Sequence, residues 1–442
     1  MVEVGKLRFQ ENRQVAEIQL ILLTKHGIDI SISEIEVLIN NFILYLTVVH
    51  QESNELIRQY IKKQGGYILH LDATCEGDSP KLVSSVDPIS GFVLYSAKLK
   101  SENKDDLVAF LEEIKNRLGD PLAVVSDMGK GIKFAVKDVF RGVPHYICHF
   151  HFLKAIGTTL FDTEHTALRK ALSKAGILGE LKKFRRKMSK KFEDIPISKI
   201  ENFLEMPGEF GKALIGSELS VYYLVLWILD HKSEGDGYGF PFDHCHLNFY
   251  QRLNAAYSII NEVVTLYSIK NKNQKIIWKL YHSIKNIVED SKLEKKVDQY
   301  KIKLTVFSEL RKSLATVPEN VKNGLRQMKE TGTYKELKAI KKAVGRFEIE
   351  LKEKIESTND KSLCKSLKKI LDKLKEHKNG LFSDPHIVKV NGRERIIFIL
   401  RTNNILENHF RRFNYWCRRI HGNQSIRRNL EHIPEQLPIV EN

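Results

Sequence analysis

Three acidic side chains, far apart in the chain, have the residue types and local settings of a metal site. Asp72 interrupts one apolar run and Asp127 closes a second. Glu407 lies further along, at the predicted start of a helix. Carboxylate oxygens are the ligands that Mg²⁺ prefers in proteins. Two carboxylates on strands and one on a helix are therefore suitable donors for a two-ion phosphoryl-transfer site, in which the ions lie about 4 Å apart.

Each aspartate also has a plainer explanation. Asp72 would be ordinary on a strand with a solvent-facing side, but it shares its face with His70 while leucines occupy the other face. Because a buried carboxylate is costly unless it is paired or binds metal, this pattern favours a metal ligand. Asp127 precedes Gly129 and could instead cap the helix that opens there. In open α/β sheets, ligands bind at the carboxyl ends of strands, so the two aspartates together favour a ligand site.

The composition predicts a soluble intracellular chain with a polyanionic partner. A chain of 442 residues favours roughly two to three domains. The formal net charge is +16, and Lys and Arg contacts to phosphates give sequence-independent affinity for nucleic acid. Five scattered cysteines fit a reducing compartment better than a disulfide framework. The N-terminus shows no apolar signal segment, and apolar runs such as 221–229 are about half of a membrane span, so no membrane partner is expected.

The first third of the chain changes from helical to strand patterns near residue 65. Residues 10–64 predict helices, with a stop at Gly27 and a cap at Ser31 or Ser33 before the next helix. This outline fits a DNA-binding helix-turn-helix, and an ordinary helical hairpin fits it equally well. The elements expected next are strands 67–74, 81–86 and 92–99, helix 105–118, strand 121–127, helix 131–140 and strand 144–149. That order predicts a mixed α/β sheet.

Charged helical patterns dominate residues 155–384, with long helices or a helical hairpin expected over 293–378. Strand pattern returns at 387–400, where an Asn-Gly pair predicts a two-residue hairpin turn. The next helix is expected over about 404–420, capped by Thr402 or Asn403. Glu407 would lie in its first turn, where the helix dipole favours a carboxylate.

Two clusters contain both cysteine and histidine. Cys148 and His151 have a C-x-x-H spacing, which occurs in zinc sites. A second cluster extends from Asp243 to His246, but nothing in the sequence pairs the two clusters. A packing and hydrogen-bonding role is therefore favoured over zinc.

Cations and aromatic residues follow Glu407 on its predicted helix. Arg411 lies four positions further along the same face, which fits either a surface salt bridge or a phosphate-binding arginine beside a metal ligand. Trp416 fits base stacking among these cations, and it fits a core position equally well. The predicted DNA contacts are Lys182, Lys183, Arg185, Arg186, Arg411, Arg412, Trp416, Arg418 and Arg419.

These motifs, in this order, resemble the DDE transposases of bacterial insertion sequences, in particular the group that includes Mutator-type elements. The resemblance is carried by residues 71–74, the turn 87–91, Ser126-Asp127, the Cys148–His151 motif and the segment from Thr402 through Glu407 to Gly422. It implies that Asp72, Asp127 and Glu407 form a catalytic triad that holds two Mg²⁺ or Mn²⁺ ions. It also implies that Cys148 and His151 support the core more than they take part in catalysis.

The resemblance further implies a fold and a domain order. The fold class is an α/β RNase H-like catalytic core interrupted by a large all-α insertion, with a small helical N-terminal domain. The expected parts are the N-terminal region 1–64, core segments 65–155 and 385–430, the insertion 156–384 and a tail 431–442. The family's cysteine-rich N-terminal zinc module has no counterpart here, so recognition of element ends would rest on the helix-turn-helix alone or on a module that this chain lacks through truncation.

The implied activity is phosphodiester hydrolysis at the ends of a mobile element, followed by transfer of the released 3′-hydroxyl to target DNA. The expected partners are element-end and target DNA and a second copy of the chain, in a homodimer on DNA in the bacterial cytoplasm. Two alternatives stay open. A nuclease on the same core would not transpose, and a DNA-binding relic would lack catalysis, although the intact triad argues against a relic. Strand-transfer products and terminal inverted repeats beside the gene would separate these alternatives.

Overall fold

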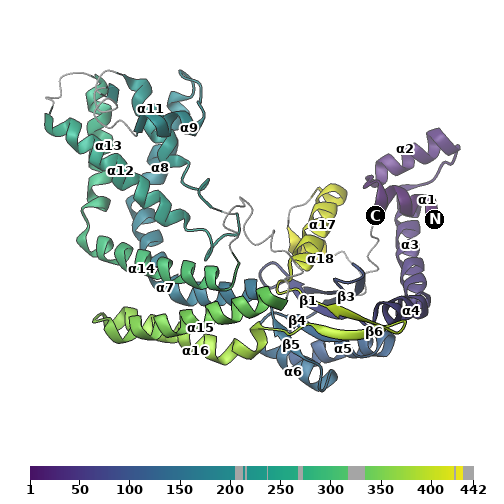
Figure 1. Cartoon of the computed structure of the whole chain (residues 1–442). Coiled ribbons are helices and arrows are strands. Elements are labelled where there is room, and N and C mark those ends of the chain that lie inside the picture. Colours follow the sequence, from purple (N-terminus) through teal and green to yellow (C-terminus); the bar gives the residue numbers. More distant parts are fainter. Residues whose placement is uncertain are drawn as a thin grey trace. The chain divides into compact units, whose positions relative to one another are not determined.

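The computed structural model describes residues 1–204, 213–214, 217–235, 237–266, 272–316, 334–422 and 425–431 (Figure 1). Contacts group the chain into two compact units. Unit 1 comprises residues 1–152, 328–342 and 374–442, and unit 2 comprises residues 153–327 and 343–373. The domain boundaries expected from the sequence stay predictions.

A five-stranded mixed sheet forms the centre of unit 1 (Figure 1). Its strands are β1 (Ile68–Thr74), β2 (Lys81–Val86), β3 (Val93–Leu99), β4 (Ala123–Ser126) and β5 (His145–Ile147). They lie in the order β3-β2-β1-β4-β5, with antiparallel pairing among the first three strands and parallel pairing of β1 with β4 and of β4 with β5. The predicted mixed α/β sheet is confirmed. The last strand is shorter than expected, because His149 already begins a helix.

Helices cover both faces of this sheet, as Figure 1 shows. Helices α5 (Lys104–Leu118) and α6 (Lys130–Val139) pack against the face that carries Leu69 and Leu71. Helix α17 (Asn404–His421) packs against β1 and β2 on the opposite face, where Leu406 and Phe410 contact Leu82 and Val86. A short helix, α18 (Ile426–Glu431), follows α17 and adds Leu430 to that cluster.

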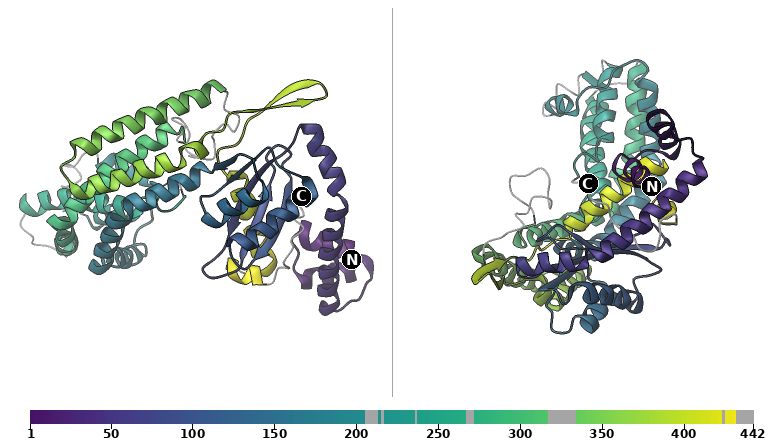
Figure 2. Two further views of the ribbon diagram at one scale, coloured as in Figure 1. Left: turned by 90° about the horizontal axis from the view of Figure 1, so that it is seen from below. Right: turned by 90° about the vertical axis from the view of Figure 1, so that its right-hand side faces the viewer.

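A hairpin precedes α17 and forms its own two-stranded sheet, which Figure 2 shows as a narrow ribbon. Its strands are β6 (His386–Val390) and β7 (Arg393–Ile397). Asn391 and Gly392 both have positive φ, +50° and +76°, as a type I′ turn requires. The hairpin turn predicted from the Asn-Gly pair is therefore confirmed.

The N-terminal part of unit 1 is helical. Its elements are α1 (Val2–Gly5), the π-helical turn η1 (Lys6–Gln10), α2 (Val15–His26), α3 (Ile32–Glu52) and α4 (Asn54–Gln64). Helix α2 ends at Gly27 in the left-handed conformation, as expected. Ser31 is the cap of α3, because its hydroxyl accepts from the Glu34 amide while the Glu34 carboxylate accepts from the Ser31 amide.

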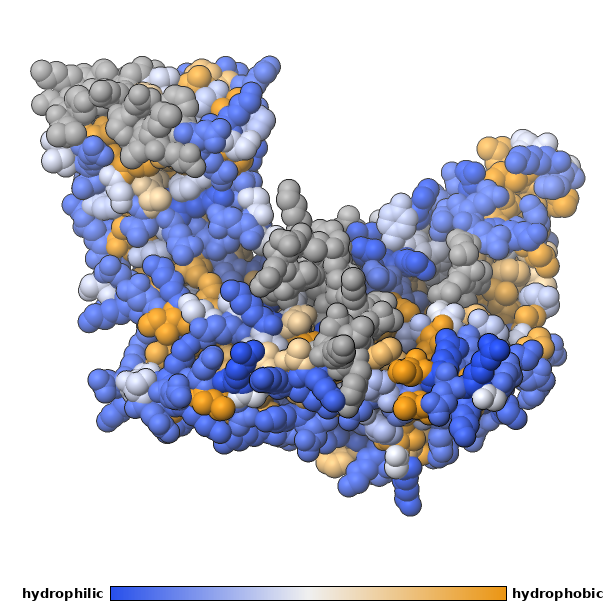
Figure 3. Space-filling model, in the orientation of Figure 1, coloured by the Kyte–Doolittle hydropathy of each residue, from blue (hydrophilic) through white to orange (hydrophobic). Residues whose placement is uncertain are grey.

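Helix α3 contains a longer apolar segment than the sequence analysis expects, where apolar runs reach about half of a membrane span. Its segment Ile32–His50 is long and apolar enough to cross a membrane by length and composition, with a mean hydropathy of 1.6, and only 17% of this window is buried. Its exposed side chains include Val37, Leu44 and Val48, and Figure 3 shows apolar surface over the N-terminal helices. A core helix of a soluble protein and a signal sequence have similar length and composition. The segment by itself therefore assigns no membrane.

Helices are the only regular secondary structure in the described part of unit 2. They are α7 (His149–Ala175), α8 (Ile177–Met188), α9 (Ile197–Leu204), α11 (Glu218–Leu229), α12 (Cys245–Leu266), α13 (Lys272–Val288), α14 (Ser291–Ser313), α15 (Tyr334–Ser357) and α16 (Lys361–Leu381). Helices α7, α15 and α16 also contribute residues to unit 1. A buried ion pair joins two of these helices, with Lys303 Nζ 2.7 Å from a Glu164 carboxylate oxygen. The long helices expected over 293–378 are present as α14, α15 and α16 where that range is described.

Gly66, just before β1, provides a test of how closely the backbone at the start of this strand packs against Leu122. Its φ is +130°, and an added Cβ would lie 2.7 Å from Leu122 Cγ, whereas Gly119 has φ +81° and free space around it. Gly119→Ala should cost about 1–3 kcal/mol from backbone strain alone. Gly66→Ala should cost about 1–3 kcal/mol more, because the methyl group also overpacks against Leu122. Equal losses in the free energy of unfolding, measured in urea, would contradict this expectation.

Candidate active site

Asp72 and Asp127 lie at the same edge of the sheet. In the parallel pairing of β1 with β4, Ile68 is opposite Ala123 and His70 is opposite Val125. Continuing this register by two residues places Asp72 beside Asp127, near the carboxyl ends of both strands. The structure thus brings together the two aspartates that the sequence singles out.

The Asp72 carboxylate is buried and is exposed by only 8%. Its Oδ1 accepts a hydrogen bond of 2.9 Å from the Ala73 amide. The pKa of this carboxyl is raised to about 7, mainly by burial and also by the negative charges of Asp127 and Glu102, whereas hydrogen bonds from Ala73 and Asn403 oppose the shift. A carboxylate held in this way gains from a cation that offsets its desolvation.

Asp127 is half-buried, and its Oδ1 accepts from the Gly129 amide at 2.9 Å. The N-cap of α6 is Gly129 itself, and that position makes no side-chain capping bond. Asp127 therefore closes a tight turn between strand and helix and is not the helix cap. The capping alternative is wrong, and the second oxygen of Asp127 is not used by this turn.

Glu407 lies in the first turn of α17, as predicted, and is half-buried. Its amide donates to the Asn403 carbonyl at 3.1 Å. Asn403 is the N-cap residue of α17, one of the two expected, but its side chain makes no capping hydrogen bond. Its Nδ2 donates instead to the Leu71 carbonyl at 2.9 Å, and its Oδ1 lies 2.9 Å from His70 Nδ1. The Asn403 side chain thus joins the start of α17 to the residues just before Asp72.

Cys148 is fully buried and links three segments of the core. Its Sγ accepts from the Asn403 amide at 3.3 Å, and its own amide donates to Ser126 at 2.8 Å. Burial raises the pKa of the Cys148 thiol to about 12, which keeps the sulfur protonated in these surroundings. The next residue, His149, donates its amide to Arg401 at 2.8 Å. These bonds agree with the supporting role preferred for this motif.

The donors that a metal would need are only partly assembled. Over the described ranges, no group of three or more His, Cys, Asp or Glu side chains is arranged to hold a metal ion. The buried Asp72 and neighbouring Asp127 supply hard oxygen donors of the kind that Mg²⁺ takes, so these two residues fit a divalent cation. Joint binding by Asp72, Asp127 and Glu407 stays a prediction.

The predicted DNA contacts on α17 divide into two kinds. Four arginines, Arg411, Arg412, Arg418 and Arg419, are exposed. Trp416 instead stacks on Phe9 of the N-terminal part, with ring centroids 5.6 Å apart, and packs into the cluster beneath α17. This placement favours the core role for Trp416 over base stacking.

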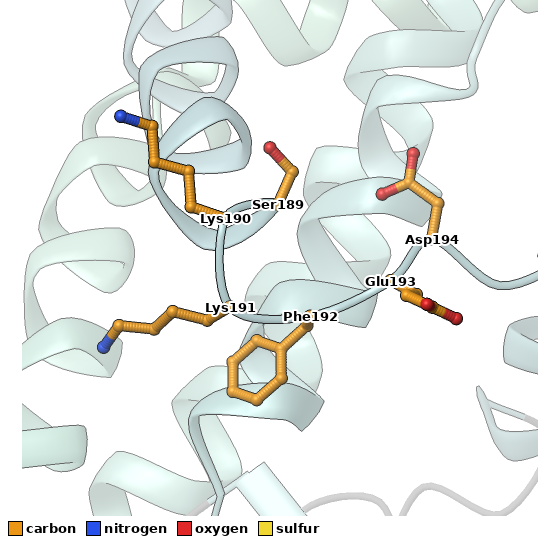
Figure 4. A pocket seen from close by; sticks show the side chains of 6 residues that line it. All are labelled: Ser189, Lys190, Lys191, Phe192, Glu193 and Asp194. Carbon is orange, nitrogen blue, oxygen red and sulfur yellow. The ribbon is translucent and has the colours of Figure 1, made fainter.

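The predicted basic contacts of unit 2 lie on α8, where Lys182, Lys183, Arg185 and Arg186 are all exposed. A shallow pocket of about 370 Å³ follows this helix and is lined by residues 189–194 (Figure 4). Two of its charged groups are paired: Asp194 pairs with Arg185 and also accepts from Tyr222, and Lys191 pairs with Glu218. The pocket includes none of the three predicted catalytic carboxylates.

Asn403 and His70 are the site residues whose roles the sequence does not predict. The only signal is that His70 shares a strand face with Asp72, while Asn403 resembles an ordinary helix cap. Their contact joins segments that are far apart in the chain, which local sequence patterns cannot predict.

Comparison of the sequence with protein-family models and with curated proteins finds no match.

The raised pKa of Asp72 predicts a pH-dependent stability in the absence of metal. The folded state holds this proton up to about pH 7, whereas the unfolded chain releases it near the usual value of 3.8, so ionisation destabilises the fold as pH rises between these values. Asp72→Asn should therefore gain stability relative to wild type across this window, by up to about 1.4 kcal/mol per pH unit. Urea unfolding in a chelator measures the difference, and the exposed Asp78→Asn serves as control. A pH-independent difference would show that Asp72 is not desolvated.

Proposed function

We propose that this chain is a DDE-type DNA transposase with an RNase H-like core. The observation that carries the proposal is the placement of Asp72 beside Asp127, near the carboxyl ends of the adjacent parallel strands β1 and β4, with α17 and Glu407 on the same face of the sheet as Asp72. The strand order β3-β2-β1-β4-β5, antiparallel on one side and parallel on the other, is the order expected of such a core. The net charge of +16 supports a nucleic-acid substrate.

Asp72, Asp127 and Glu407 would hold the divalent ions, Mg²⁺ or Mn²⁺. Bound ions of this kind activate an attacking oxygen and stabilise the leaving oxygen of a phosphodiester. The chain itself orients the carboxylates, because Asp72 is fixed by its strand and Asp127 by its turn to Gly129. Exposed arginines on α17, such as Arg411 and Arg412, would contact the phosphates on either side of the reacting bond.

Two successive displacements would occur at this site. In the first, a water oxygen bonds to phosphorus at the element end, and the 3′-oxygen leaves as a hydroxyl. In the second, that 3′-hydroxyl bonds to a target phosphorus, and the target's 3′-oxygen leaves. Each step exchanges one phosphorus–oxygen bond for another, so the same carboxylates serve both and no external energy source is required.

The runner-up is a nuclease on the same core that stops after the first displacement. Both activities need the same three carboxylates, and they differ only in whether the released 3′-hydroxyl is kept and joined to a second DNA. A catalytically inactive DNA-binding relic is the third reading. The burial of Asp72 argues against it, because a buried carboxylate is costly unless it is paired or binds a cation.

Asp127→Asn is the decisive single substitution. The amide keeps the volume of the side chain and its bond to the Gly129 amide, but it removes the charge that would hold a cation. We expect DNA binding to survive, because affinity rests on Lys and Arg contacts to phosphates. Cleavage and strand transfer should fall by about 100-fold or more, as when another preorganised charge-stabilising group is lost. The assay uses purified protein, labelled element-end DNA and Mg²⁺ or Mn²⁺.

The exposed Asp78→Asn is the matched control and should cut at the wild-type rate. Wild-type activity in Asp127→Asn would show that the site is wrongly assigned. Joint loss of folding and DNA binding would show that Asp127 is structural. Nicked products without joined products from wild type would identify the nuclease, and neither product would identify the relic.

The exposed lysines of α8 predict a nonspecific contribution to DNA affinity. Lys182→Ala should weaken binding about equally for all DNA sequences and reduce the salt dependence of binding by about one unit of slope. Lys352→Ala is a matched control, since this exposed lysine pairs with Glu348 at 3.2 Å and its removal changes the net charge equally. Fluorescence anisotropy over a range of salt concentrations measures both slopes. Identical slopes for the two variants would remove α8 from the DNA-binding surface.

A further inference from the structure

We propose that Asn403 is a positioning residue, which holds the first turn of α17, and with it Glu407, against the end of β1 beside Asp72. The inference rests on the proposed function, because it assigns a role within that site. Asn403 does not reach the reacting atoms in this role. It acts through the two carboxylate-bearing segments that it joins.

Every polar group of Asn403 has a partner, although the residue is only 1% exposed. Its amide donates to Cys148 Sγ at 3.3 Å, and its carbonyl accepts from the amides of Leu406 and Glu407. Its side chain bonds to the Leu71 carbonyl and to His70 Nδ1, both at 2.9 Å, and it also donates towards the Asp72 carboxyl. One residue thus contacts the strand that carries Asp72, the helix that carries Glu407 and the segment that follows β5.

The chemistry of these partners fixes the orientation of the side-chain amide. A backbone carbonyl can only accept, so Nδ2 must face Leu71, and Oδ1 must face His70. His70 then carries its proton on Nδ1 and donates it to Asn403. A carboxylate here would lose the donor to Leu71, and a serine hydroxyl could not span both partners. A short amide is therefore the side chain that meets both requirements.

His70 gives a second, independent indication of the same role. The ring is completely buried, and its Nε2 has no hydrogen-bond partner among the described residues. Leaving such an atom unpaired costs about 1–3 kcal/mol, so an apolar residue would serve the core better. The contact from Nδ1 to Asn403 is the feature of His70 that offsets this cost, which points to a functional need for a fixed Asn403.

Loss of the Asn403 side chain should disturb the site without detaching the helix. Leu406 and Phe410 still pack α17 against Leu82 and Val86 of β2. That apolar contact is non-directional and does not set how far the helix start lies along β1. A displacement of about 1 Å at a catalytic group lowers rates by about 100-fold, so a small slip of the first turn is enough to impair catalysis.

The experiment compares Asn403→Ala with Asn414→Ala. Asn414 is a matched control, because it lies on the same helix and its side-chain oxygen is buried without a hydrogen-bond partner among the described residues. Hydrogen exchange of amides in the first turn of α17 reports the positioning directly. The rate and the Mg²⁺ dependence of cleavage report its consequence, and anisotropy reports DNA affinity.

We expect Asn403→Ala to lose protection in the first turn of α17. Its kcat should fall by about 10–100-fold, the size typical for residues that orient metal ligands, and it should need more Mg²⁺ for half-maximal rate. KM for DNA should change less than twofold, and Asn414→Ala should match wild type in all readouts. Asn403→Asp, which keeps the oxygen that faces His70, is the second variant if alanine prevents folding.

Unchanged exchange in the first turn of α17, or equal losses in the position 403 and 414 variants, would overturn the proposal. Unchanged kcat and Mg²⁺ requirement in a variant with a loosened first turn would overturn it as well. Failure of the proposed function has a different signature. In that case wild type would cut no DNA with any divalent ion, while the exchange data would still decide whether Asn403 positions α17.

Discussion

The parallel pairing of β1 with β4 is the constraint on which the candidate site depends. Because the two strands run in the same direction, their carboxyl ends open at one edge of the sheet and bring Asp72 and Asp127 together. Side chains alternate along a strand, so a slip of one residue would move Asp72 into the apolar layer under α5 and α6. Leu69 and Leu71, buried in that layer, prevent the slip. The same apolar packing that stabilises unit 1 thereby keeps Asp72 next to Asp127.

The face of β1 under α17 carries buried polar side chains that a protein core normally excludes. His70 and Asp72 are both nearly inaccessible to solvent, yet one histidine nitrogen has no partner among the described residues and the carboxyl has a pKa near 7, mainly because of its burial. An apolar pair would pack at lower free energy. Natural sequences keep such conflicts mainly where function requires them. Two conflicts within three residues of one strand distinguish this face from the apolar face that lies opposite.

The sequence predicts the elements well and their connections poorly. Alternation in β1 and helical spacing in α5 follow from local burial, so their positions could be predicted within a residue or two. The turns at Gly27 and Asn391 could be predicted because few residues adopt positive φ. The sequence places Asn403 at the start of α17 but does not reveal its side-chain bonds to Leu71 and His70, because a helix cap and a long-range amide contact look alike in sequence. It also does not predict the exposure of α3, since an apolar pattern does not say which side chains find partners.

The path of the chain into α17, the helix that carries Glu407, explains why hydrogen bonds are needed at the start of this helix. The hairpin β6–β7 forms a separate sheet, so the chain returns to unit 1 outside the ladder of the five strands. Strand pairing, which sets the register of β1 against β4, therefore does not set the register of α17. Apolar contacts of Leu406 and Phe410 hold the helix on β2, but they tolerate sliding. Hydrogen bonds are directional, and those of Asn403 with Leu71, His70 and Cys148 supply the missing register. Side-chain bonds thus replace backbone pairing where the helix that carries Glu407 meets the sheet.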